Sequence, residues 1–111
     1  KDVESIDIFE EKRDDIFSNH WLSAITISKD ADFTREDLRL ALLEDQIESR
    51  PLWKPMHMQP VFKDLPFYGG QIAEDLFERG LCLPSGSNLT DQEKSRISIK
   101  INEFLKYHGL I

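Results

Sequence analysis

The sequence predicts an α+β fold, in which helices cover a small and mainly antiparallel sheet. Three observations predict this class. Runs of β-branched and apolar residues alternate with segments of helical periodicity, two helical segments open with capping signals, and prolines or glycines close several runs. The predicted order is two strands, a helix, a strand, a long loop, a helix, a strand and a helix. A length of 111 residues corresponds to a single domain, residues 1–111.

The first third of the chain predicts two strands. Over residues 3–9 the sequence is β-branched but does not alternate cleanly. Residues 21–27 predict the better strand, with Trp21, Ile25 and Ile27 on one face and mostly apolar residues on the other. Apolar residues on both faces are typical of a central or doubly covered strand, so we expect residues 21–27 to lie in the middle of the sheet.

A helix is predicted over residues 34–45. Thr34 is a suitable N-cap, and the acidic residues that follow it favour the positive end of the helix dipole. The residues that recur at helical spacing and should form its buried stripe are Leu38, Ala41 and Leu42. After this helix we expect a short strand at residues 47–50, ended by Pro51.

Residues 51–70 differ from the rest of the chain, because four of the five prolines and both methionines lie there. We expect an ordered, apolar and irregular loop with one helical turn near Gln59. A long loop of this kind inside a compact domain is often functional. The alternative is a loop that only covers the core.

A second helix is predicted over residues 71–79, followed by Gly80 as the glycine that ends it. A short strand at residues 81–83 comes next and is stopped by Pro84. The apolar face of the helix should consist of Ile72, Ala73, Leu76 and Phe77.

The last helix is predicted over residues 91–107. Thr90 and Glu93 match a capping box at its start, and Gly109 is expected to end it. Its buried stripe should consist of Ile97, Ile101, Phe104 and Leu105.

The charge of the chain excludes several classes of partner. Fourteen basic and 21 acidic residues give a formal charge of −7. Binding to nucleic-acid phosphates or to anionic membranes needs an excess of Lys and Arg on one face, so we expect neither partner. No apolar stretch approaches the roughly 18 residues that span a bilayer.

The termini and the single cysteine bear on location and completeness. The charged N-terminal stretch has no apolar core typical of a signal peptide, and Cys82 has no second cysteine to pair with. We therefore expect a reducing, cytoplasmic location. The chain begins at Lys1 without an initiator methionine. Either a few residues are missing from a small protein, or the chain is a piece of a longer one.

Most candidate catalytic groups are weak. The three histidines, His20, His57 and His108, lack partners at metal-ligand spacing, so we expect no metal site. Ser85 does not lie in a G-x-S-x-G elbow, because proline replaces the first glycine and asparagine the last. Cys82 lies in an apolar strand, where a thiol is usually inert.

Two further features concern anion binding. Gly69 and Gly70 precede a helix and could hold an anion on free N–H groups, but a turn explains two glycines better. The strongest candidate is the cluster of Arg50, Trp53, Lys54 and His57. Two cations suit a diphosphate, and an indole offers a stacking face for a base or sugar. The alternative is that Trp53 belongs to the core and the cations are solvated.

Four stretches of the chain resemble a known family. They read SNHWLSAITI, TREDLRLALLEDQIESRPLWKPMHMQPVF, PFYGG and DLFERGLCLPSGSNLT. Together they resemble the C-terminal part of DegT/DnrJ/EryC1/StrS-type sugar aminotransferases, over residues 18–107. RPLWKPMH further resembles enzymes that make 4-amino sugars on UDP, such as bacillosamine-pathway aminotransferases. Residues 1–17 match this family poorly.

The resemblance implies that the chain is the small C-terminal α+β domain of a fold-type-I aminotransferase. In this family pyridoxal phosphate is bound by a large N-terminal domain, which supplies the Schiff-base lysine and the acidic partner of the pyridine nitrogen. None of the eight lysines matches that lysine. The chain alone should therefore bind no cofactor, carry no catalytic residue and be inactive. The complete enzyme should be a homodimer that aminates a UDP-linked 4-keto sugar, with glutamate as donor.

The resemblance also implies a substrate contact. The Pro-x-His element of the family falls on Pro55-Met56-His57, in a segment close to the nucleotide-sugar site. His57 is thus a substrate-binding candidate. Arg50, Trp53 and Lys54 lie in the same matching stretch and are further candidates.

Three hypotheses follow from these observations. The chain is a fragment of a nucleotide-sugar aminotransferase, or a free-standing α+β module that binds a nucleotide or another anion. The third possibility is a structural or dimerisation domain.

Overall fold

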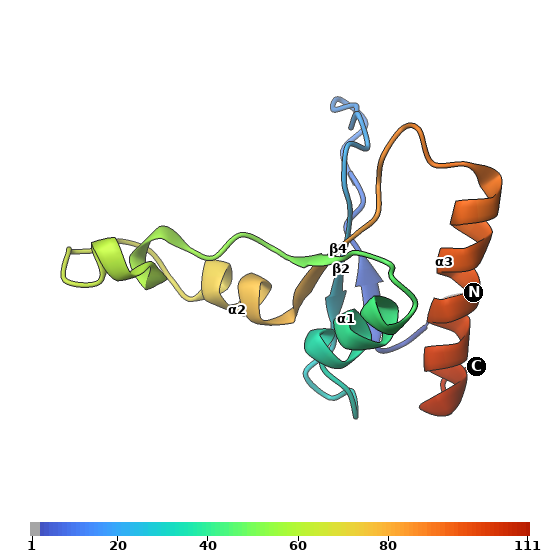
Figure 1. Cartoon of the computed structure of the whole chain (residues 1–111). Helices are drawn as coiled ribbons and strands as arrows, with labels where there is room; N and C mark the ends of the chain where they lie inside the picture. Colours follow the sequence, from blue (N-terminus) through green and yellow to red (C-terminus); the bar gives the residue numbers. More distant parts are fainter. Residues whose placement is uncertain (1–2) are drawn as a thin grey trace.

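The computed structural model describes residues 3–111 and confirms the α+β class. Four strands form one antiparallel sheet in the order β1-β2-β4-β3 (Figure 1). The strands are β1 (Ile6–Ile8), β2 (Ser23–Ile27), β3 (Arg50–Pro51) and β4 (Gly80–Leu83). The helices are α1 (Arg35–Glu44), α2 (Ile72–Arg79) and α3 (Asp91–Tyr107). No helix among these residues is long and apolar enough to cross a bilayer.

One face of the sheet carries the core. Ile25 of β2 lies opposite Leu81 of β4, and Ile27 lies opposite Ile6 of β1. Residues directly opposite in an antiparallel pair share a face, so these apolar side chains form one layer against α1 and α3. The buried residues of this core are Ile25, Ile27, Phe33, Leu38, Leu42, Ile47, Leu81 and Leu105.

The two capping signals are confirmed. Thr34 and Thr90 each accept a hydrogen bond from the backbone N–H three residues later, and the carboxylates of Asp37 and Glu93 accept one from the backbone N–H of the threonine. Both helices end in the same way. Gln46 after α1 and Gly109 after α3 have φ values of 58° and 70°, and the next N–H donates back to the last turn.

The position of Trp21 differs from the prediction. β2 begins at Ser23, and Trp21 lies outside it with 67% of its surface exposed. His20 has a φ of 50°, which breaks the extended backbone just before the strand. The Ser23 N–H then donates to the Ser85 hydroxyl at 2.7 Å and fixes the start of the strand. β2 does lie between β1 and β4, as its apolar sequence indicates.

The third strand is shorter than predicted and lies further along the chain. Residues 47–49 are not a strand, because the Ile47 N–H completes the end of α1 by donating to the Leu42 carbonyl at 3.0 Å. The strand consists of Arg50 and Pro51 and pairs with Cys82 and Leu81. Proline is tolerated there because β3 is an edge strand.

Gly80 has another role than the predicted one. Its φ of −89° and ψ of 141° are extended, and α2 passes into β4 without a left-handed residue. A Cβ at Gly80 would collide with the side chain of Leu52 and the carbonyl of Leu76. Glycine is therefore needed for close packing. The apolar face of α2 is also less buried than expected, since Ile72 is 75% exposed.

We expect Gly80→Ala to lower the unfolding free energy by about 1–3 kcal/mol, because the Leu76 carbonyl cannot move without distorting α2. Gly70→Ala is the matched control, since a Cβ at Gly70 meets no atom within 4 Å. Denaturant unfolding followed by circular dichroism measures both variants. Equal stability of the two would contradict the steric explanation.

Candidate functional site

The candidate residues lie on or beside an arm that leaves the sheet. We define the arm as residues 52–71, which connect β3 to α2 and extend away from the rest of the molecule (Figure 1). Two short 3-10 turns, Met56–Met58 and Pro60–Phe62, lie on either side of Gln59, where one helical turn was expected. Prolines restrict the backbone here, which lowers the entropy that a bound conformation loses.

His57 contacts both a later part of the arm and the start of α2. Its Nε2 lies 2.7 Å from Oε1 of Glu74 in the first turn of α2. Its ring stacks on Phe67 with centroids 3.8 Å apart and planes inclined by 15°. Only 19% of the His57 side chain is exposed. The ring is therefore oriented from two sides, and its Nδ1 forms no hydrogen bond within residues 3–111.

Trp53 is not part of the core. Its indole is 69% exposed and stacks on Trp21, with centroids 6.2 Å apart and planes inclined by 24°. Trp21 was not a predicted site residue, because strand periodicity placed it in the sheet. The polar residue Asn19 is the one sequence signal that the strand begins after Trp21, since its side chain accepts from the Trp21 N–H; the left-handed backbone of His20 is seen only in the structure. Two large aromatic surfaces thus lie side by side at the base of the arm.

The two predicted cations are at the surface. Arg50 is ion-paired with Glu48 at 2.5 Å, and 78% of its side chain is exposed. Arg50 also lines a cavity of about 370 Å³ between the β3–β4 edge and the start of α3. Lys54 is exposed on the arm, and its carbonyl accepts a bond from Gln59. The four predicted residues thus lie at the base of the arm and in its first part, but each contacts a different partner.

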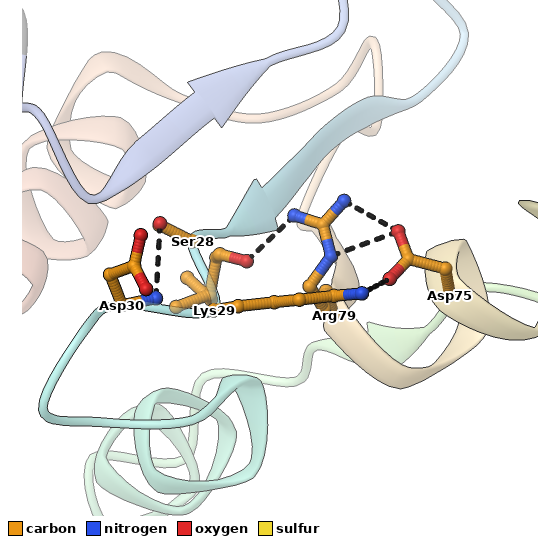
Figure 2. A network of polar contacts seen from close by, with 6 residues as sticks. Ser28, Lys29, Asp30, Asp75 and Arg79 are labelled. Carbon is orange, nitrogen blue, oxygen red and sulfur yellow. Dashed lines mark hydrogen bonds and ion pairs between the residues drawn. The ribbon is translucent and has the colours of Figure 1, made fainter.

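A polar network attaches α2, which follows the arm, to the sheet. Arg79, at the end of α2, lies between the carbonyl of Ile27 and the carboxylate of Asp75. Figure 2 shows its guanidinium beside that carboxylate. The Arg79 Nη1 donates to the Ile27 carbonyl at 2.9 Å, and Nη2 donates to Asp75 at 2.7 Å. Lys29 lies 2.5 Å from the other carboxylate oxygen. These bonds orient α2, and with it Glu74 and the His57 ring.

The same network makes stability depend on pH. Arg79 first, and Lys29 second, lower the pKa of Asp75 from 3.8 to about 2. A lowered pKa in the folded state adds stability that is present above about pH 4 and is lost as the pH falls toward 2.

We expect Asp75→Asn to be less stable than wild type at pH 6, and the difference to disappear near pH 2. Unfolding curves across this range measure it. The exposed Asp64→Asn serves as control, and a pH-independent difference for Asp75→Asn would contradict the assignment.

The remaining candidates have structural explanations. The Ser85 hydroxyl donates to the Leu83 carbonyl at 2.7 Å and accepts from the Ser23 N–H, so it connects β2 to the end of β4. Burial raises the pKa of the Cys82 thiol, which opposes formation of a reactive thiolate. Gly69 has a φ of 125°, as a turn requires. Within residues 3–111, no three potential ligands are grouped as a metal site.

Comparison with known proteins gives consistent matches. Residues 1–102 match the model of the DegT/DnrJ/EryC1/StrS aminotransferase family, so the match includes residues 1–17, for which only a poor resemblance was predicted. The chain is 48% identical over 84 residues to the putative pyridoxal phosphate-dependent aminotransferase EpsN of Bacillus subtilis (strain 168). It is 34% identical over 104 residues to GDP-perosamine synthase of Escherichia coli O157:H7.

These alignments cover most of this chain and a small part of each relative. They span 72% and 94% of this chain, but only 21% and 28% of the two relatives. In fold, the chain resembles the aminotransferase TlmJ from Streptoalloteichus hindustanus, with a TM-score of 0.79 at 16% identity. That likeness covers 95% of this chain and 27% of TlmJ. The chain thus spans about a quarter of the length of the proteins it matches.

Proposed function

The chain belongs to the DegT/DnrJ/EryC1/StrS aminotransferase family, and from this membership we propose that it is the C-terminal domain of a longer sugar aminotransferase. The complete enzyme would transfer an amino group to a keto sugar carried on a nucleotide. The observation that carries the proposal is the family match over residues 1–102. It is supported by the 48% identity to EpsN, a relative that is named as a putative pyridoxal phosphate-dependent aminotransferase.

Residues 3–111 do not fit a site for the cofactor itself. Pyridoxal phosphate supplies an electron sink when it is bound through a lysine imine. The lysines described here are unsuited to that bond, because six of the seven are exposed at the surface and Lys100 is ion-paired with Asp45. The Schiff-base lysine would then belong to a preceding domain of the complete enzyme, and no catalytic step is assigned to this chain.

In this proposal the chain contributes to substrate binding. Glu74 and Phe67 hold the His57 ring, and Nδ1 is the nitrogen that remains for a ligand. With Nε2 donating to Glu74, Nδ1 accepts from a sugar hydroxyl when the ring is neutral and donates to a diphosphate oxygen when it is charged. Trp53 would stack on the base or sugar. Arg50 and Lys54 would place positive charge near the diphosphate.

The substrate proposal favours a UDP-linked 4-keto sugar with glutamate as amino donor. A GDP-linked sugar is the second candidate, because a relative 34% identical to this chain is named a GDP-perosamine synthase. The two are separated by incubating the complete enzyme with glutamate and either 4-keto sugar nucleotide. Mass spectrometry of the product shows which nucleotide is retained on the amino sugar. Failure to aminate either would contradict the proposal.

We expect residues 1–111 alone to be inactive. After incubation with pyridoxal phosphate, imine absorbance should not exceed that of nonspecific surface lysines. Borohydride reduction and peptide mapping check this expectation. A saturable adduct at one lysine, together with turnover of a keto sugar and glutamate, would overturn the fragment hypothesis. If residues 1–111 bind a nucleotide or another anion and the complete protein has no aminotransferase activity, the free-standing binding module is favoured instead.

A further inference from the structure

A basic cavity lies where the end of β2, the start of α1 and the end of α2 meet. Its volume is about 440 Å³, which is within the roughly 300–1,000 Å³ range of small-molecule sites. The charged residues that line it are Lys29, Arg35, Arg79 and Glu78. The side chain of Ser28 adds a hydroxyl group to the lining. Three of the four charged residues are thus basic, and they come from three different segments.

The guanidinium of Arg35 is held from two sides. Its Nε donates to the Glu78 carbonyl at 2.7 Å, and its Cζ lies 5.2 Å from the centroid of the Phe77 ring. Its Nη1 is buried and has no hydrogen-bond partner among the described residues 3–111. Within the same residues Arg35 forms no ion pair. Because partly buried charges and polar groups are stabilised by partners of opposite charge, this arrangement favours an anion beside Arg35.

Lys29 and Arg79 share a single carboxylate. Figure 2 shows both side chains directed at Asp75. A lysine ammonium has three N–H donors, and Asp75 takes one of them at 2.5 Å. The neighbouring Asp30 and Asp32 are exposed and do not line the cavity. Asp75 therefore orients the two cations but balances only one of their two charges.

We propose that the basic cavity binds the phosphate group of a small-molecule ligand. Its three basic residues outnumber the carboxylates of Asp75 and Glu78, which leaves a charge of +1. Lysine and arginine form charge-assisted hydrogen bonds with phosphate oxygens. Lys29 donates through the protons that Asp75 does not accept, and the fixed guanidinium of Arg35 offsets the negative charge. The proposal goes beyond the proposed function and does not depend on amino-group transfer.

Phosphorus-31 NMR of inorganic phosphate tests the site in the complete protein. The phosphate line is expected to broaden when the protein is added, at an ionic strength kept constant with chloride. Lys29→Gln should weaken phosphate binding by at least about tenfold, because it removes a charge-assisted hydrogen bond. Lys94→Gln is the matched control, since Lys94 is also an exposed lysine paired with an aspartate, Asp91. It should bind phosphate as wild type does.

Arg35→Gln supplies a second variant, with the same expected loss of at least about tenfold. Arg39→Gln is its control on the same helix, because Arg39 is paired with Glu36 and does not line the cavity. Melting temperatures show which variants fold, and if Arg35→Gln does not, the exposed Lys29→Gln still decides. The proposal is overturned if wild type does not broaden the phosphate line, or if Lys29→Gln binds phosphate as tightly as wild type.

Crystals of the complete protein soaked in selenate locate the anion directly. Selenate is tetrahedral like phosphate, and its selenium gives an anomalous signal. A peak within hydrogen-bond distance of Lys29 Nζ and beside the guanidinium of Arg35 supports the proposal. A carboxylate from elsewhere in the complete protein at that position contradicts it. A selenate peak without phosphate binding in solution indicates an adventitious ion only and also contradicts it.

Titration with UDP identifies the source of the phosphate group. If UDP reverses the part of the broadening that depends on Lys29, the ligand carries its phosphate on a nucleotide. If UDP does not, the ligand is inorganic phosphate. Both results support a phosphate site in the cavity. None of these measurements uses amino-group transfer as its readout, so a failure of the proposed function is distinguished from a failure of this proposal.

Discussion

Replacing His57 with alanine in the complete enzyme is expected to lower kcat/KM for the nucleotide sugar by about one to two orders of magnitude. A hydrogen bond to a charged group contributes roughly 1.5–3 kcal/mol, and this loss corresponds to that factor in rate. Under the proposed function, the half-reaction with the proposed donor glutamate should change little, since that step would precede binding of the sugar. Single-turnover measurements of each half-reaction, with the melting temperature of the same variant, give the comparison.

The structure also suggests a competing explanation for such a loss. His57 connects the first part of the arm to Phe67 further along it and to Glu74 of α2. If that were its only role, His57→Ala would impair both half-reactions alike, in step with a lower melting temperature. Glu74→Gln tests the same point, because the Phe67 stack still holds the ring; we expect a smaller loss than with His57→Ala. His20→Asn is the control, since this substitution keeps a residue that tolerates the left-handed backbone.

Two adjacent leucines of α1 should differ sharply in their contribution to stability. Leu42 is fully buried in the core, whereas Leu43 is 51% exposed. Leu42→Ala is expected to cost about 2–5 kcal/mol of unfolding free energy, because it removes apolar contacts and leaves a cavity between α1 and the sheet. Leu43→Ala should cost less than about 1 kcal/mol. Since both variants change helix propensity equally, the difference reports burial alone.

Guanidinium unfolding followed by far-ultraviolet circular dichroism measures this pair on residues 1–111. Hydrogen exchange of the α1 amides in the complete protein should rank the two variants in the same order. Similar losses for both would show that α1 does not pack on the sheet as Figure 1 presents it.

Elements specified by neighbouring residues could be predicted well. The starts of α1 and α3 follow from Thr34 and Thr90, whose side chains bond to groups three residues away. The end of α3 follows from Gly109, which adopts the left-handed backbone that glycine favours. The stripe that includes Leu38 and Leu42 identified the buried face of α1. These features depend on bonds and periodicity within a few residues, and local sequence contains that information.

Part of the candidate site could be anticipated in the same way. The dense prolines predicted an irregular segment, and the resemblance of residues 50–57 to a known family directed attention to His57. Its partners could not be found from the sequence, because Glu74 lies 17 residues further along the chain. Trp21 and Trp53 likewise come from separate segments, and a strand pattern that includes Trp21 does not show that the strand begins only at Ser23.

By itself, the sequence determined the fold class, the helix starts, the central place of β2 and the family of the protein. Tertiary structure alone decided where β3 pairs, why residue 80 is glycine and how exposed the arm is. β3 consists of Arg50 and Pro51 because β4 offers hydrogen-bonding partners there, and Gly80 is needed because Leu52 approaches it closely. The physical reason is common to all three. Pairing, steric exclusion and solvent exposure depend on segments that are distant in sequence, and these acquire defined distances only when the chain is folded.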